Sequence, residues 1–288
     1  MLPARWWYGM SINKTLGPQE FEAFRNFLQD ACGILLGDNK QYLVTSRLGK
    51  IMAQQKMESL TDLMREMQRN PRSGLKEAVV DAMTTNETLW FRDVHPFNIL
   101  ENIVLPEIAP KLGAQQLKIW SSASSTGQEA YSISMVIEEF RRKNPSLLRG
   151  GEKIIGTDIS ATAVATARSG VYEMLAIGRG LSKDRLTKHF TQTGEGRWKV
   201  NPNIQRRAEF RMINLLHSYS MLGKFDVVFC RNVLIYFSAE LKKDILTRIH
   251  GTLKPGGYLF LGASEALSNM PDLYEMVQCR PGIIYRAK

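Results

Sequence analysis

The sequence predicts an α/β protein, in which a small all-α domain precedes a doubly wound, mostly parallel sheet that closes with an antiparallel hairpin. Three observations predict it. Residues 19–82 carry apolar side chains at helical spacing and show no strand pattern, whereas from Leu117 onward short apolar runs alternate with helical segments. The C-terminal stretch "YEMVQCRPGIIYRAK" consists of two strand-like runs around a Pro-Gly turn, which indicates an antiparallel hairpin at one edge.

The all-α domain is expected at residues 10–83. Its second helix lies in "GDNKQYLVTSRLGKIMAQQ", where Asp38 is a candidate N-cap because short acidic side chains accept hydrogen bonds from the first helical amides. The expected buried stripe of this helix consists of Tyr42, Leu43, Leu48, Ile51 and Met52. The first nine residues precede a second methionine, Met10, and are expected to have no role in the fold.

A linker and a sheet domain follow. The linker is expected at residues 84–94, within "MTTNETLWFRD", and the sheet domain at residues 95–288. The candidate parallel strands are the runs "LKIWS", "KIIGTD", "AEFRMIN", "FDVVFCRN" and "GGYLFLGA". Residues 188–208, which include "FTQTGEGRWKV", are expected to form a strand-turn-strand insertion, a small β-subdomain.

Composition narrows the classes of function. The net charge of +10 indicates an acidic partner such as nucleic acid, a membrane surface or an anionic protein. No apolar run approaches the about 18 residues of a membrane span. The first ten residues are unlike a signal peptide, so a cytoplasmic protein without membrane insertion is expected. Cys32, Cys230 and Cys279 have no metal-site spacing, which predicts buried, reduced thiols and no metal centre.

The segment "LKIWSSASSTGQEAYS" predicts a strand, a polar loop and a helix, the place where nucleotide-binding folds carry a glycine-rich phosphate cradle. Here the loop has one glycine, Gly127, among serines and threonines. This favours S-adenosylmethionine, which has no phosphate but requires an acid for its ribose hydroxyls. Candidate acids are Glu129 and Asp158. Alternatively, Glu129 faces the helix dipole and Asp158 is the N-cap of "ISATAVATA".

Six motifs in order, together with the helical front, resemble the CheR-type chemotaxis methyltransferases. The motifs are "MTTNETLWFRD", "IWSSASSTGQEAYS", "GTDIS", "INLL", "FDVVFCRNVLIYF" and "LKPGGYLFLGASE", and the likeness runs from about Phe21 to the C-terminus. The resemblance implies a Rossmann-like class I methyltransferase fold. It also implies a protein-glutamate O-methyltransferase that acts on chemoreceptors in sensory adaptation, with S-adenosylhomocysteine as product and no metal.

The resemblance implies roles for residues of these motifs. The cofactor-binding residues that it implies are Asn86, Thr88, Arg92, Glu129, Asp158, Asn214, Leu215, Arg231 and Asn232. Arg92 and Tyr236 are implied beside the reacting methyl group. The stretch "GASEAL" departs from the family's common Gly-His-Ser-Glu, so Ser264 and Glu265 receive no role.

The chemistry of such a reaction is consistent with these residue types. A glutamate carboxylate has a pKa of about 4.3 and is already ionised at neutral pH, so the reaction needs no general base. His95, His189, His217 and His250 lie outside the strongest motifs and are interpreted as structural or surface groups.

The basic charge suggests how a receptor is recognised. Residues 41–56 contain Arg47, Lys50 and Lys56 and no acid. The resemblance favours this helix as the docking surface for an acidic receptor bundle, and the alternative is a solvated basic face. Gly194-Glu195-Gly196 predicts a tight turn in the small β-subdomain. Family members that bind a receptor C-terminal pentapeptide resemble one another in a longer loop here, so the resemblance implies that this chain does not bind one.

Other classes of function are weighed against this one. A nucleic-acid methyltransferase would suit the basic charge, but Cys-Arg-Asn-Val replaces the Asn/Asp-Pro-Pro-aromatic motif after "DVVF". A non-catalytic scaffold that binds the cofactor or a receptor would be expected to lack Arg92 or Asp158. A dinucleotide oxidoreductase would need Gly-x-Gly spacing in the loop.

Overall fold

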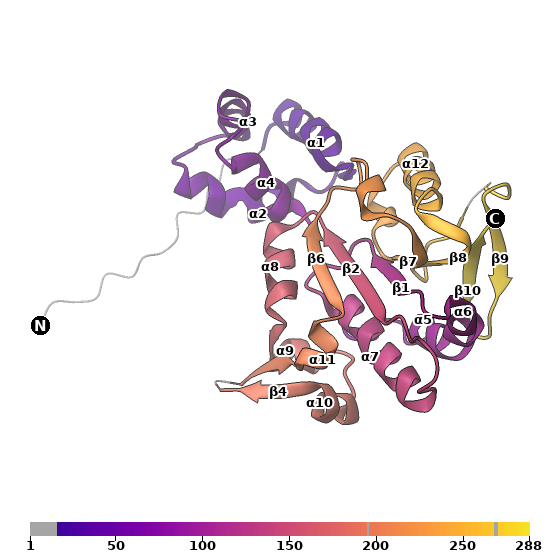
Figure 1. Cartoon of the computed structure of the whole chain (residues 1–288). Helices are drawn as coiled ribbons and strands as arrows, with labels where there is room; N and C mark the ends of the chain where they lie inside the picture. Colours follow the sequence, from indigo (N-terminus) through magenta and orange to yellow (C-terminus); the bar gives the residue numbers. More distant parts are fainter. Residues whose placement is uncertain (1–15, 195, 268–269) are drawn as a thin grey trace, which may run out of the picture. The chain divides into compact units, whose positions relative to one another are not determined.

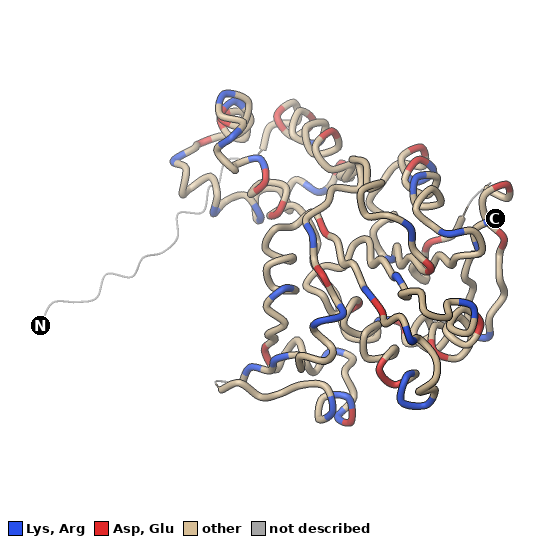
Figure 2. The backbone as a smooth tube through the Cα atoms, in the orientation of Figure 1, with Lys and Arg blue, Asp and Glu red and all other residues tan. Residues whose placement is uncertain are grey.

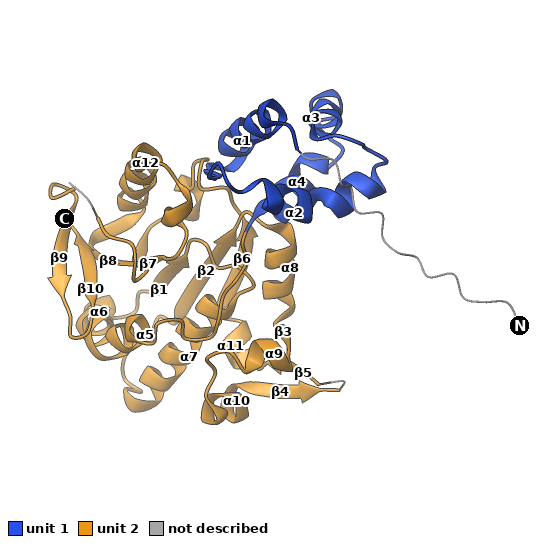
Figure 3. Ribbon diagram, turned by 180° about the vertical axis from the view of Figure 1, so that it is seen from behind, with its two compact units in different colours: residues 1–84 blue, residues 85–288 orange. Residues whose placement is uncertain are grey.

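The computed structural model describes residues 16–194, 196–267 and 270–288 (Figure 1). The chain divides into two compact units, Met1–Thr84 and Thr85–Lys288 (Figure 3). The described part of the first unit is all α, and the second unit holds the sheets, so the predicted fold class is confirmed. The first nine residues and Glu195 lie outside the described ranges. Within those ranges, no helix has both the length and the apolar character needed to cross a membrane.

From residue 16 onward, the first unit consists of four helices: α1 (Pro18–Cys32), α2 (Gln41–Gln54), α3 (Leu60–Arg69) and α4 (Leu75–Met83). α1 starts with a proline, whose missing N–H costs nothing in the first turn. Ser59 caps α3, because its side chain accepts a hydrogen bond from Asp62 N at 3.1 Å. The fully buried core includes Phe24, Leu28 and Leu63.

For α2, the expected N-cap is wrong, and the expected buried stripe is confirmed only at Leu48 and Met52. Asp38 does not cap the helix; the N-cap is Lys40, which makes no side-chain cap bond, and Asp38 pairs with Arg25 instead. The buried stripe is Val44, Leu48 and Met52, spaced by one helical turn, while Tyr42 is 60% exposed. Two residues along a helix turn the side chain by about 200°, so Tyr42 and Val44 face opposite ways.

The second unit is built on a seven-stranded sheet. The strand order is β6 (Ala208–Met212), β2 (Glu152–Asp158), β1 (Leu117–Ser121), β7 (Phe225–Cys230), β8 (Leu253–Leu261), β10 (Ile283–Ala287) and β9 (Tyr274–Gln278). The first five strands of this order pair in parallel. β10 runs antiparallel to both of its neighbours, so the C-terminal hairpin forms the edge with β9 outermost.

Apolar layers cover both faces of this sheet (Figure 1). Along β7, Val227 and Phe229 join one buried cluster while Val228 and Cys230 join the other, because successive side chains of a strand point to opposite faces. The first cluster includes residues of α5 (His95–Ile99), α6 (Leu105–Leu112), α7 (Gln128–Lys143) and α8 (Ala161–Ser169), with the π-helical turn Leu100–Val104 between α5 and α6. The second includes residues of α12 (Ala239–His250). Coverage on both faces explains the continuous apolar run "FDVVFC".

A second, three-stranded antiparallel sheet lies between β2 and β6 in the chain. Its order is β3 (Val171–Glu173), β5 (Arg197–Val200) and β4 (Phe190–Thr193). β3 precedes the expected range 188–208, and three residues are too few for an alternating pattern to reveal. Short helices complete this region: α9 (Met174–Ile177), α10 (Lys183–His189) and α11 (Pro202–Gln205).

Candidate functional site

Polar residues gather at the carboxyl ends of the parallel strands. Asp158 is the last residue of β2, Ser121 is the last of β1, and Arg231 directly follows β7. The chain leaves β1 toward β2 on one side, and later returns to β7 on the other side. In open α/β sheets such a change of direction opens a crevice at the carboxyl edge, where ligands bind.

Backbone amides of the loop between β1 and α7 are bonded to β7, to β2 and within the loop itself. Ser122 N donates to Phe229 O and Ser124 N to Thr157 O, both at 2.8 Å, while Gly127 N donates to Ser124 O at 2.9 Å. Because these amides are already bonded within the protein, the loop is not a cradle of free N–H groups for phosphates. This geometry fits S-adenosylmethionine better than a dinucleotide.

The one glycine of this loop is required by its surroundings. Gly127 has φ +98°, and a Cβ there would lie 2.9 Å from the Cβ of Ala167 and 3.0 Å from the hydroxyl of Tyr172. Glycine therefore serves the turn into α7 and the close packing against α8 rather than a ligand.

Asp158 is buried, at 8% exposure, behind this loop. Its Oδ2 accepts a hydrogen bond from Ser125 N at 2.8 Å, and its Oδ1 accepts one from Ser160 N at 3.0 Å. The alternative in which Asp158 caps the following helix is wrong, because Ser160 is the N-cap of α8 and accepts from Ala163 N at 3.0 Å. Sequence reasoning missed Ser160, although a serine before "ATAVATA" is an N-cap signature.

The linker is tied to the same edge through Asn86. Its Nδ2 donates to Ser160 Oγ at 3.1 Å, and its carbonyl accepts from Ser125 Oγ at 2.8 Å. Asn86, Ser125, Asp158 and Ser160 are therefore joined in one hydrogen-bonded group.

A second group surrounds Arg231, whose side chain is 1% exposed. Its Nη1 donates to Glu129 Oε2 at 2.8 Å, and its Nη2 donates to Asp93 Oδ2 at 2.7 Å and to Arg92 O at 2.9 Å. Glu129 Oε1 accepts from Ser121 Oγ at 2.7 Å. Arg231 thus joins the start of α7 to the linker, and Glu129 does more than face the helix dipole.

The remaining predicted residues lie in these segments. Arg92 is half-buried in the linker, and its Nη1 lies 3.4 Å from Glu87 O. Tyr236 is half-buried in the single 3-10 turn Leu234–Tyr236 after β7. Thr88 is half-buried in the linker, and Asn214 and Leu215 follow β6, where Asn214 Oδ1 accepts from Leu216 N at 3.0 Å.

The linker around Arg92 has a strained backbone held from several sides. Phe91, Asp93 and Val94 have φ values of +50°, +67° and +52°, which residues other than glycine rarely adopt. Trp90 Nε1 donates to Ala176 O at 3.1 Å, and Phe91 N donates to Ser132 Oγ at 3.1 Å. The surrounding bonds are expected to hold Arg92 in one place.

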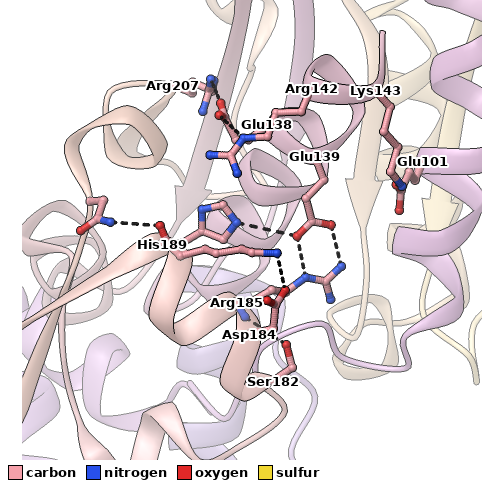
Figure 4. Close-up of polar contacts among 12 residues, drawn as sticks. Glu101, Glu138, Glu139, Arg142, Lys143, Ser182, Asp184, Arg185, His189 and Arg207 are labelled. Atoms are coloured by element: carbon pink, nitrogen blue, oxygen red, sulfur yellow. Dashed lines mark hydrogen bonds and ion pairs between the residues drawn. The ribbon is translucent and has the colours of Figure 1, made fainter.

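The ion pair between Arg185 and Glu139 supports the same linker through the Phe91 ring. Sequence reasoning missed this pair. The guanidinium of Arg185 lies 3.8 Å from the centre of the Phe91 ring and makes two hydrogen bonds to Glu139, at 2.8 and 2.9 Å (Figure 4). Burial alone raises the pKa of Glu139, but the bonds from Arg185 and the nearby His189 outweigh it and lower the pKa to about 2. Arg185 and Glu139 are 46 residues apart in the sequence, so no local pattern could have predicted that they pair.

Within the described ranges, no three His, Cys, Asp or Glu side chains are grouped as metal ligands would be. The buried His189 lies beside Glu139, with Nε2 3.7 Å from Oε1. Burial raises the pKa of the Cys230 thiol to about 12, which keeps it protonated at neutral pH.

Two family models match the chain, one for each of its two compact units. The model of the "CheR methyltransferase, all-alpha domain" matches residues 19–84, and that of the "CheR methyltransferase, SAM binding domain" matches residues 86–283. The chain is 61% identical to chemotaxis protein methyltransferase Cher2 of Pseudomonas putida, over 94% of this chain and 99% of that protein. It is 62% identical to chemotaxis protein methyltransferase 1 of Pseudomonas aeruginosa, over 93% and 98%. It is 33% identical to the Salmonella typhimurium chemotaxis protein methyltransferase, over 91% and 88%.

Proposed function

The chain belongs to the CheR methyltransferase family, and on that premise we propose that it methylates glutamate side chains of chemoreceptors. Methylation of chemoreceptors with S-adenosylmethionine follows from the family. The glutamate carboxylate as acceptor, giving a glutamyl methyl ester, is the finer part of the proposal.

The observation that carries the proposal is the buried carboxylate of Asp158 behind a loop in which the amides of Ser122, Ser124, Ser125 and Gly127 are already bonded. A carboxylate at this strand end suits two ribose hydroxyls, and the closed loop suits a cofactor without phosphates. When bound, S-adenosylmethionine supplies an electrophilic methyl group on a sulfonium. We assign the other cofactor contacts to Asn86, Thr88, Arg92, Glu129, Asn214, Leu215, Arg231 and Asn232.

In this proposal Arg92 and Tyr236 act on the substrate glutamate. Its carboxylate is ionised at neutral pH and attacks the methyl carbon in line, while the carbon–sulfur bond breaks and its electron pair stays on sulfur. Arg92 orients the carboxylate through a planar, two-donor fork, and Tyr236 donates to it or flanks the methyl group. Since opposite charges cancel in this step, a crevice drier than water favours the transition state.

We further propose that residues 10–83 dock the receptor and that residues 84–94 contribute to the cofactor site. α2 has basic but no acidic residues, unlike α1, α3 and α4 (Figure 2). Lys50 is exposed on α2, and the exposed Lys56 follows the end of the helix with φ +56°. Arg47 is half-buried and donates to Met83 O and Thr84 O, so its main task in this proposal is to stabilise the end of α4.

The test is a transfer assay with methyl-labelled S-adenosylmethionine, receptor-rich membranes and added DNA and RNA. The expected product is label on a receptor band that mild base releases as methanol, because esters hydrolyse and methylated nitrogen does not. Label in nucleic acid, or base-stable label on protein, would contradict glutamate as the acceptor. Binding of S-adenosylhomocysteine without any transfer would indicate a scaffold instead.

A further inference from the structure

Glu265, in the loop after β8, accepts hydrogen bonds from four backbone amides. Its Oε2 accepts from Asn232 N at 2.7 Å and from Gly262 N at 2.8 Å. Its Oε1 accepts from Val233 N at 3.0 Å and from Ile235 N at 3.3 Å. Three of these amides lie 30 to 33 residues earlier in the chain, so one carboxylate joins the loop after β7 to the loop after β8.

The loop after β7 needs such a partner. It contains Asn232, whose φ of +58° is uncommon outside glycine, and then a single 3-10 turn from Leu234 to Tyr236. The first amides of a helical turn have no acceptor within the turn, so another group must accept from them. Glu265 supplies that acceptor with a full negative charge, which makes the bonds stronger than bonds to a neutral oxygen.

Gly262 provides independent evidence for this arrangement. A Cβ at this position would lie 2.6 Å from Glu265 Oε2 and 2.9 Å from Asn232 N. Its φ is not in the left-handed region, so glycine is required here for space alone. The two loops therefore approach each other so closely that a side chain at position 262 would collide with both the carboxylate and Asn232.

The loop held in this way carries Asn232 and Tyr236 of the candidate site. We propose that Glu265 is a positioning residue for methyl transfer, which fixes the backbone so that these two side chains meet the cofactor and the substrate glutamate. This inference rests on the proposed function. Arg231 anchors the start of the same loop through Glu129 and Asp93, so Glu265 is responsible for the part that follows.

The first experiment compares Glu265→Gln with Ser264→Ala, a change of the exposed neighbouring side chain. Glutamine has nearly the same shape, but its NH₂ group cannot accept from an amide. We expect kcat to fall at least about 10-fold for Glu265→Gln, while KM for receptor stays within about 2-fold, as for loss of a transition-state contact. Ser264→Ala should retain the wild-type kcat. A wild-type kcat in folded Glu265→Gln would overturn the proposal.

A double-mutant cycle with Tyr236→Phe separates positioning from general loosening of the fold. If Glu265 acts by placing Tyr236, Glu265→Gln should cost less in the Tyr236→Phe background than in the wild type. Equal costs in both backgrounds would argue against the proposal. If Glu265→Gln does not fold, Gly262→Ala can replace it, because the added Cβ would displace the Glu265 carboxylate. Gly262→Ala should then show the same low kcat.

Amide hydrogen exchange keeps this proposal distinct from the proposed function. The amides of Asn232, Val233 and Ile235 should exchange at least about 10-fold faster in Glu265→Gln than in the wild type, because they lose their acceptor. Unchanged exchange would overturn the role of Glu265 even in an active enzyme. A wild-type protein that transfers no methyl to receptor would refute the proposed function, whatever the exchange shows.

Discussion

At the scale of single residues, Arg231 shows that both terminal nitrogens of a charged group at the site can bind other groups of the protein. Its buried guanidinium binds two carboxylates and a carbonyl. Removing one partner of such a buried group leaves the others without compensation and typically costs about 3–5 kcal/mol. Loss of activity in an Arg231 variant would therefore not demonstrate contact with the cofactor, and Asp158 and Arg92 are better probes.

Asp158→Asn should weaken binding of S-adenosylhomocysteine by about 10- to 100-fold, since a charge-assisted hydrogen bond contributes about 1.5–3 kcal/mol. Asparagine has the shape of aspartate and keeps one acceptor for the amides of Ser125 and Ser160. Calorimetry measures the affinity, and a thermal melt shows that the variant is folded. Ser160→Ala, which removes the cap of α8, is the control for local disorder. Unchanged affinity in folded Asp158→Asn would remove Asp158 from the site.

Arg92→Ala should lower kcat for receptor methylation by about 10- to 100-fold with little effect on melting temperature, because the carboxylate loses a charged donor. The kcat of Arg92→Lys should lie between those of the wild type and Arg92→Ala, since lysine keeps the charge but loses the planar pair of donors. Arg179→Ala is a matched control, because Arg179 pairs with the exposed Glu87 at 2.6 Å on the surface. Wild-type kcat for Arg92→Ala would exclude an aligning role.

At the scale of elements, the linker is positioned by contacts with α7, α9 and α10. Its left-handed residues, Phe91, Asp93 and Val94, need such support, because each strained conformation costs about 1–3 kcal/mol. The Arg185–Glu139 pair provides part of that support through the Phe91 ring.

Glu139 gives this support a pH dependence. Its folded pKa of about 2 lies below the ordinary 4.5, so it stabilises the fold fully above pH 4.5, and this contribution is lost as pH falls toward 2. Glu139→Gln should lower the melting temperature at pH 7, and the difference from wild type should shrink between pH 4.5 and 2. Melting curves against pH measure this. Glu22→Gln, an exposed acid in α1, is the control, and a constant difference across the range would contradict the role of Glu139.

The charge of α2 can be tested without disturbing Arg47. Lys50→Glu with Lys56→Glu should raise KM for receptor several-fold and leave affinity for S-adenosylhomocysteine unchanged, because both lysines are exposed. Added salt should weaken the wild-type interaction, since exposed charges are screened over about 10 Å at 0.1 M. Lys183→Glu with Lys243→Glu changes the net charge equally on the other unit. If the two double variants raise KM for receptor equally, the receptor does not dock specifically on α2.

The elements themselves were predictable because their signals are local. Most parallel strands contain a short apolar run, as in β7, and covered sheet faces require such runs. The three-residue β3 was missed, since it is too short for a pattern. The buried face of α2 was predicted at Leu48 and Met52 but not at Val44. The role of Glu265 could not be read from the sequence, because its amide partners become neighbours only when β7 and β8 pair.

The candidate site was predictable only as a set of residues. The motifs placed Asp158, Glu129 and Arg231 near one crevice, as the carboxyl ends of neighbouring parallel strands must be. They did not reveal that Glu129 and Arg231 bind each other, or that Ser160 rather than Asp158 caps α8. Such bonds depend on side-chain direction, which short motifs do not determine.

At the scale of the whole molecule, we propose that the first unit recognises the receptor and the second carries the chemistry, without a tether to the receptor's C-terminus. In the small sheet, Thr193 pairs with Arg197, which leaves only residues 194–196 between β4 and β5. A loop this short offers little backbone to a peptide that adds as a strand. Calorimetric titration with a Trp-Glu-Glu-Phe-type pentapeptide should show no saturable binding. Binding at low micromolar peptide would show that a tether exists.

β10 lies between β8 and β9, although it is the last of the three to leave the ribosome. Until residues 283–287 have been synthesised, β8 has an open edge and β9 lacks its partner. Truncation within β10 would therefore remove an interior strand of the sheet and not a peripheral one. A nascent or shortened chain would expose the edge of β8 to other chains, and open edges of this kind favour aggregation. The sheet that carries the candidate site is complete only when β10 has inserted between β8 and β9.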